Sequence, residues 1–171
     1  MTESRNTWEE HYRNKQTPWD TGITPPEVVA FWQSGKLARS GLALDLGCGT
    51  ATNVAYLRQL GLDAIGVEHA WSALQQGRQR LTERRLAAAL VQADVSQLPF
   101  RAANANYLLD IGCFHGLFAE QRPGYVAGVV ENLLRQLHPF FGLLALGDVA
   151  HDGPHRFRLP VLVAHEESPQ L

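Results

Sequence analysis

From residue 41 onward, short apolar runs alternate with segments of helical spacing. The apolar runs, which we interpret as strands, cover 41–46, 62–67, 87–92, 107–111 and 142–146. The segments with apolar residues at helical spacing cover 50–60, 70–85 and 124–137. Such alternation predicts a mostly parallel sheet with helices on both faces, because right-handed crossovers return over alternate sides of the sheet. We therefore predict an α/β, doubly wound fold, which binds ligands beyond the carboxyl ends of its strands.

The length of 171 residues predicts a single domain. Its expected parts are an N-terminal helical lid or extension over 1–40, an α/β core over 41–147 and a C-terminal segment over 148–171. In the extension, a helix over 4–14 would place Trp8, His11 and Tyr12 on one side. After a turn-rich stretch, Pro26 suits the first turn of a second helix.

Charge and composition exclude several classes of protein. The net charge of −2 and pI near 6.4 argue against a nucleic-acid partner, which usually requires a basic face. No apolar run approaches the length of a membrane span, and the polar N-terminus does not have the form of a secretory signal. Two cysteines, Cys48 and Cys113, do not make a disulfide framework. We expect a cytoplasmic protein with no membrane partner.

The segment 45–50, DLGCGT, is the strongest local signal for a ligand site, because it lies where a strand ends and a helix begins. Gly47 and Gly49 would allow a sharp turn and a close approach of the backbone to a ligand. Glu68 follows the second strand, where an acid can accept hydrogen bonds from ribose hydroxyls. Asp94 follows the third strand and can accept from an adenine amino group. Acids at three successive strand ends predict a nucleoside pocket.

These residues resemble a known family. Residues 41–110 are similar to the cofactor half of class I S-adenosylmethionine-dependent methyltransferases, whose first motif resembles 45–50. The segment 110–115, DIGCFH, is similar to the fourth-strand segment of members that act on small molecules. Trp8, Tyr12 and the segment 19–25 resemble the N-terminal lid of the thiopurine and tellurite-resistance branch.

The resemblance implies S-adenosyl-L-methionine as the cofactor and methyl transfer to a small-molecule nucleophile, with a thiol or another soft acceptor favoured. The cofactor-binding residues that it implies are Trp19, Asp45, Gly47, Cys48, Gly49, Glu68, His69, Ala93, Asp94, Val95, Ile111 and Gly112. Asp45 would lie near the amino group, and Ile111 and Gly112 under the sulfonium. An aromatic face attracts a sulfonium cation, so Trp19 would cover the cofactor. His115 is the candidate general base for an alcohol or amine acceptor.

Other interpretations of these residues stay open at this point. Asp94 can be a turn cap, Asp110 a structural acid, and His115 a satisfied histidine of the interior. A nicotinamide-dependent oxidoreductase is a rival function, although its glycine fingerprint requires a small residue where Thr52 stands. A second rival is a cofactor-binding pseudoenzyme or interaction module.

The C-terminal segment departs from the family pattern. The run 138–142, HPFFG, replaces the usual glycine-rich turn before the fifth strand, and 24 residues follow Gly147. Only one further strand, 157–164, is apparent, so we expect an abbreviated member that lacks part of the C-terminal strand pair. Its pocket would then be incomplete or completed by a second subunit in a homodimer. His151 and His155 have metal-ligand spacing, but Gly153 and Pro154 between them argue against a helix, and we expect no metal site.

Overall fold

The computed structural model describes residues 3–100 and 105–134 of the chain. These residues form parallel strands, the helices that connect them and two helices of the N-terminal extension. The helices are α1 (Glu3–Arg13), α2 (Pro26–Gln33), α3 (Thr52–Gln59), α4 (Trp71–Glu83) and α5 (Arg122–Leu134), with short 3₁₀ turns η1 (Val95–Gln97) and η2 (Phe114–Gly116). The strands are β1 (Leu42–Leu46), β2 (Asp63–Glu68), β3 (Ala89–Gln92) and β4 (Tyr107–Asp110). The predicted strands 142–146 and 157–164 and the segment 148–171 lie outside the described residues.

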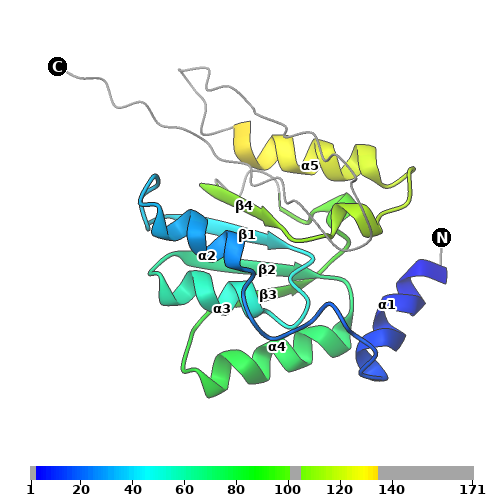
Figure 1. The fold of residues 1–171 in the computed structure, drawn as a ribbon. Helices are drawn as coiled ribbons and strands as arrows, with labels where there is room; N and C mark the ends of the chain where they lie inside the picture. The colour runs from blue at the N-terminus through cyan, green and yellow to red at the C-terminus, as the bar shows by residue number, and fades with distance from the viewer. Residues whose placement is uncertain (1–2, 101–104, 135–171) are drawn as a thin grey trace.

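The four described strands form one parallel sheet in the order β3-β2-β1-β4 (Figure 1). Leu46, the last residue of β1, lies opposite both Val67 of β2 and Asp110 of β4. Glu68 lies opposite Gln92 of β3. The carboxyl ends of all four strands therefore meet at one edge of the sheet, as the predicted fold requires.

Helices cover both faces of this sheet, with α5 on the opposite side from α3 and α4 (Figure 1). On one face, residues of α2, α3 and α4 pack with Ala43 and Ala64 in a single apolar cluster. On the other face, Leu44 and Leu46 pack with Val95 and with Tyr125 of α5. Alternate residues of the central strand β1 thus enter different clusters, because successive side chains of a strand point to opposite faces. The doubly wound α/β arrangement is confirmed for the described strands.

Helix α5 packs on the sheet through Tyr125 and Val129, whereas Val126 of the same helix is exposed. The helix begins at Arg122, two residues earlier than predicted, and Val126 is 49% exposed. Tyr125 is buried instead, and Gly124 lies so near the carbonyl oxygen of Ser96 that a Cβ there would collide with it. The close approach of α5 to η1 selects this face. Val126, one of the apolar residues at helical spacing in the predicted helix 124–137, is therefore not a core residue.

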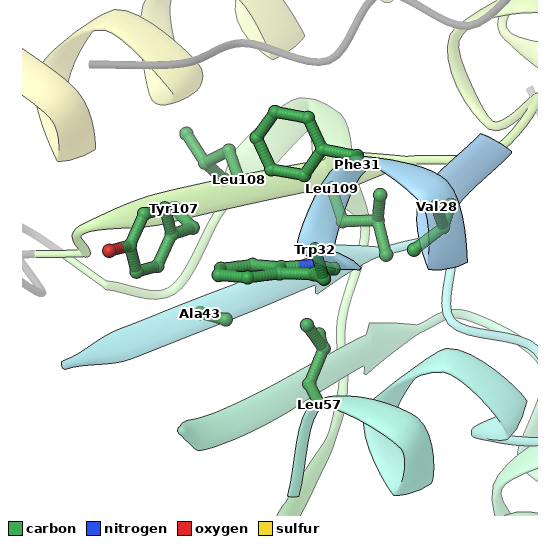
Figure 2. Close-up of a pocket in the computed structure, with 8 residues that line it drawn as sticks. All are labelled: Val28, Phe31, Trp32, Ala43, Leu57, Tyr107, Leu108 and Leu109. Atoms are coloured by element: carbon green, nitrogen blue, oxygen red, sulfur yellow. The ribbon is translucent and has the colours of Figure 1, made fainter. Parts of the chain in front are cut away.

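An apolar pocket lies between α2 and the sheet (Figure 2). It is lined by Val28, Phe31, Trp32, Ala43, Leu57, Tyr107, Leu108 and Leu109. The only side-chain polar groups among these residues are the indole N–H of Trp32 and the hydroxyl of Tyr107, which donates to the carbonyl of Ala38. Within the described ranges, no helix combines the length and apolar character that a membrane crossing requires.

Candidate functional site

The turn after β1 brings the backbone back over the edge of the sheet. Gly47 and Cys48 both donate their N–H to the carbonyl oxygen of Val67 (2.8 and 3.0 Å). Gly47 and Gly49 have φ values of +72° and +51°, a region that favours glycine, and Ala51 follows at +59°. Helix α3 therefore begins at Thr52 and not at residue 50, as the sequence predicted.

Both glycines of this turn are also in close contact with other segments. A Cβ at Gly47 would lie 2.6 Å from the Cβ and Sγ of Cys113, which follows β4. A Cβ at Gly49 would lie 2.6 Å from the hydroxyl oxygen of Tyr12, in α1. The predicted tight turn is present, and it is the point where the N-terminal extension and the segment after β4 both approach β1.

Asp45 is a buried carboxyl group with an unused acceptor. The residue is 1% exposed, and its Oδ2 has no hydrogen-bond partner among the described residues. Burial, followed by the charges of Asp110 and Glu68, raises the pKa of Asp45 to about 8. Loss of its proton in this position is unfavourable unless a cation or a donor comes close.

Glu68, at the end of β2, is a second buried carboxylate, and it accepts hydrogen bonds from three backbone N–H groups. Its Oε2 accepts from Gly49 (3.0 Å), and its Oε1 from His69 and Ala70 (2.7 and 2.8 Å). Burial raises the pKa of Glu68, while these hydrogen bonds act in the opposite direction. A carboxylate offers about four acceptor positions, so Glu68 can still accept from a ligand.

Asp94 follows β3 and caps the short turn η1. Its Oδ1 accepts from the backbone N–H and the hydroxyl of Ser96 (2.9 and 2.6 Å). Ala93 donates its N–H to the carbonyl of Glu68 (3.0 Å), which joins this segment to the end of β2, and Val95 is buried in the core. The turn-cap interpretation of Asp94 is confirmed. A role for Asp94 toward adenine stays a prediction.

Asp110, at the end of β4, organises the loop that follows it. Its carboxylate accepts from the N–H groups of Cys113 and Phe114 (2.8 and 3.0 Å) and from the hydroxyl of Tyr125. Burial, the largest influence, raises the pKa of Asp110. These bonds support the structural interpretation of Asp110. They also fix the loop that contains Ile111, which is half-buried, and the exposed Gly112 (φ +82°).

His115 lies in the next turn, η2, and is exposed. It follows β4, as predicted, and its exposure contradicts the interpretation of His115 as a satisfied histidine of the interior. Both cysteines are free thiols: Cys48 is buried and Cys113 half-buried. Burial raises the pKa of each thiol well above its usual range, so neither is a reactive thiolate.

The N-terminal extension is fixed to this edge by side-chain contacts that the sequence did not predict. Glu9 of α1 accepts from the N–H and hydroxyl of Ser72 in α4 (3.0 and 2.5 Å). Asp20 accepts from the hydroxyl of Thr50, next to the glycine turn (2.7 Å). Trp19, which is 47% exposed, donates to the hydroxyl of Tyr12 (3.3 Å). The turn-rich character of 17–26 was the one visible signal, and it did not indicate these partners.

Comparison with known proteins identifies the family. Residues 43–138 match the family described as "Methyltransferase domain". The chain belongs to this methyltransferase family. The α/β fold with a parallel sheet, expected from the sequence, is that of Rossmann-like methyltransferases.

Individual relatives of this chain agree with the family assignment. The 2-heptyl-1-hydroxyquinolin-4(1H)-one methyltransferase of Mycobacteroides abscessus is 30% identical over 140 residues, which are 77% of this chain and 61% of the relative. A structure described as "Conversion of a Disulfide Bond into a Thioacetal Group during Echinomycin Biosynthesis" is 27% identical, with a TM-score of 0.62 over 67% of this chain and 48% of the other.

A third similarity concerns the fold alone. Magnesium protoporphyrin IX methyltransferase from Synechocystis PCC 6803, solved with bound SAM, is 17% identical, with a TM-score of 0.53 over 61% of this chain and 50% of that one. The chain thus spans 61% of the length of the curated relative and about half of each solved structure.

Proposed function

We propose that this methyltransferase binds S-adenosyl-L-methionine at the carboxyl ends of β1, β2 and β3 and transfers the methyl group to a small molecule. The observation that carries the proposal is the buried carboxyl of Asp45, beside a glycine turn at the edge where this fold binds ligands. One oxygen of this carboxyl has no hydrogen-bond partner among the residues that the structure describes. When bound, the cofactor supplies an activated methyl group on a sulfonium cation.

The residues at this edge fit such a cofactor. An ammonium group near Asp45 would stabilise the carboxylate form that burial disfavours. The turn formed by Gly47, Cys48 and Gly49 would lie against the methionine portion. Glu68, with His69 beside it, retains an acceptor position for a ribose hydroxyl.

The remaining residues would enclose the adenine and the sulfonium. Ala93, Asp94 and Val95 would border the adenine, and Ile111 and Gly112 the sulfonium. Trp19 would cover the cofactor with its partly exposed ring, because an aromatic face attracts a sulfonium cation. The protein then contributes chiefly proximity, orientation and exclusion of water, which together remove roughly 7–11 kcal/mol of a barrier in favourable cases. We also propose that the N-terminal extension is a lid of the thiopurine and tellurite-resistance type.

The acceptor that we propose is a small molecule with a soft or readily ionised nucleophile. A thiol requires little assistance, because its pKa is only about 8.5. The quinolone substrate that gives the M. abscessus relative its name carries a hydroxyl on nitrogen, which belongs to the same broad class of small nucleophile. For a less acidic acceptor, His115 would receive the proton, since it lies in the turn after β4.

A turnover assay tests this function. The full chain would be incubated with S-adenosyl-L-methionine and with thiols, the relative's hydroxyquinolone or an alcohol, and S-adenosylhomocysteine would be measured by mass spectrometry. We expect product with at least one acceptor, and His115→Gln should lower kcat for the alcohol by about 10²–10⁴-fold while thiol turnover persists. A folded protein that binds the cofactor but turns over no acceptor would support the pseudoenzyme hypothesis instead.

A further inference from the structure

Four rings of the N-terminal extension form one cluster at the edge of the sheet. This aromatic cluster consists of Trp8, His11, Tyr12 and Trp19. Trp19 is its centre, with ring centroids 5.3 Å from Trp8, 5.5 Å from His11 and 6.2 Å from Tyr12, all in edge-to-face orientation. Such pairs are a favourable arrangement for aromatic rings, so the cluster is a defined surface and not a set of independent side chains.

The cluster extends from one side of the proposed cofactor site to the other. At one end, the hydroxyl of Tyr12 lies against Gly49 of the glycine turn. At the other end, the Trp8 ring lies against Gly116, where a Cβ would be 3.0 Å from its Cζ2. Gly116 adjoins His115 in the turn after β4. Trp8 is therefore the member of the cluster nearest the side from which an acceptor would approach the sulfonium.

Two features of the cluster are unfavourable in the isolated protein. Trp8 and Trp19 are 37% and 47% exposed, whereas Trp32 is buried at 5%. The Nδ1 atom of His11 is buried and has no hydrogen-bond partner among the described residues. Exposed ring surface and an unpaired polar atom both cost free energy, and a flat ligand would cover the exposed rings.

We propose that Trp8 and His11, backed by Trp19, form the wall that binds the methyl acceptor, and that the acceptor is a planar aromatic molecule with a hydroxyl or thiol group. This proposal rests on the proposed function, because methyl transfer to an acceptor bound by Trp8 and His11 requires S-adenosyl-L-methionine on the opposite side of Trp19. The acceptor ring packs against Trp8 at the edge-to-face or offset distances that aromatic pairs prefer. Its polar group forms a hydrogen bond with the imidazole of His11.

The four tryptophans of the chain provide a direct test with internal controls. The ¹⁵N-labelled full chain, saturated with S-adenosylhomocysteine, would be titrated with 1-hydroxyquinolin-4(1H)-one while the indole N–H signals are recorded by NMR. Tryptophan-to-phenylalanine variants assign the signals. We expect saturable shifts of the Trp8 signal and none of Trp32 or Trp71. Trp71 is the matched control, because it is 41% exposed but pairs with Arg78 outside the cluster.

Variants separate this wall from the cofactor site. Trp8→Ala should lower the affinity for the quinolone by about tenfold. Trp8→Phe should largely restore that affinity, since stacking and apolar contact depend on an aromatic side chain at this position. His11→Ala should weaken it by a smaller factor, and Trp71→Ala should not change it. S-adenosylhomocysteine affinity, measured by calorimetry, should stay within about twofold in all of these variants. The saturated analogue 1-hydroxypiperidine, which keeps the N-hydroxyl group, should bind far more weakly than the quinolone.

Several results would overturn the proposal. One is an unchanged affinity of Trp8→Ala for the quinolone, and another is an affinity of the wild type for 1-hydroxypiperidine equal to that for the quinolone. A third is a titration in which the quinolone shifts the Trp71 signal but not the Trp8 signal. The last is the absence of saturable quinolone binding by the protein loaded with S-adenosylhomocysteine. In each case S-adenosylhomocysteine binding by the wild type shows that the cofactor site itself is intact. If the folded wild type does not bind S-adenosylhomocysteine, the proposed function fails first, and this inference fails with it.

Discussion

The apolar pocket beneath α2 and the carboxyl edge of the sheet are built from opposite kinds of residue. Apolar side chains such as Leu57 and Trp32 surround the pocket (Figure 2). The edge instead holds the carboxyl groups of Asp45, Glu68 and Asp110, whose pKa values burial raises. It also holds three glycines with positive φ, Gly47, Gly49 and Gly112.

This difference separates packing from function. The pocket residues contribute apolar burial, which stabilises the fold wherever it occurs. The edge residues oppose stability, because a buried carboxylate costs free energy and so does the left-handed backbone of a residue other than glycine, such as Ala51. Perturbed titratable groups at the ligand-binding edge of a fold are typical of functional sites. The visible cavity in the described region is therefore a feature of packing, and the polar edge is the candidate site.

The largest expected effect is on the pH dependence of stability at the edge. A folded pKa of about 8 for Asp45 means that the folded state keeps a proton that the unfolded chain has released above pH 4. The contribution of Asp45 to stability is thus full below about pH 4 and is lost as the pH rises to about 8. Asp45→Asn has no proton to lose, so from pH 5 to 9 it should gain about 4 kcal/mol relative to wild type.

Urea denaturation at several pH values measures this effect. The control is Asp63→Asn, on an exposed carboxyl at the opposite end of β2, which should show no comparable gain. A constant difference between Asp45→Asn and wild type across this pH range would contradict the buried, protonated state of Asp45.

The second prediction concerns the contribution of the apolar pocket to the stability of the fold. Leu57 is 1% exposed, and Leu57→Ala should lower the free energy of unfolding by about 2–5 kcal/mol through lost burial and a new cavity. Its S-adenosylhomocysteine affinity should remain within about twofold of wild type at a temperature where the variant is folded. Loss of S-adenosylhomocysteine binding in a folded Leu57→Ala protein would contradict the assignment of the pocket to packing and of the polar edge to ligand binding.

A smaller effect compares two glycines with the same backbone conformation. Gly47 and Gly35 have φ values of +72° and +70°, but of the two only Gly47 would bring an added Cβ within 4 Å of other described atoms. Gly47→Ala and Gly35→Ala should each lose about 1–2 kcal/mol through backbone strain, with a further loss at Gly47 from contact with Cys113. Only Gly47→Ala should also weaken S-adenosylhomocysteine binding. Equal binding by both variants would show that the glycine turn does not contact the ligand.

Local patterns in the sequence account for most of the fold. Apolar runs and glycines specify the strands and the turn at Gly47 because those preferences depend on near neighbours. Glu9 and Ser72, in contrast, are 63 positions apart, and Asp20 and Thr50 are 30 apart. No periodicity connects such pairs, so the attachment of the extension was not predictable. The exposure of Val126 has a related cause, since close packing of Gly124 against Ser96 orients α5.

The candidate site was predicted in position but not in detail. The acids at the strand ends were identifiable because each follows an apolar run. Their partners were not, since Glu68 accepts from the backbone of Gly49, 19 positions away, and Asp110 from the hydroxyl of Tyr125. The orientation of a carboxyl group depends on which donors the folded chain brings near it.

Cofactor binding at the polar edge is tested most directly by isothermal titration of the full chain with S-adenosylhomocysteine. We predict one saturable site in the wild type and an affinity lower by about tenfold or more in Glu68→Gln, because a hydrogen bond to a charged group contributes about 1.5–3 kcal/mol. Glu27→Gln, on the exposed surface of α2, is the matched control and should bind like the wild type. Absence of saturable binding by the folded wild type, or unchanged affinity in Glu68→Gln, would contradict the account.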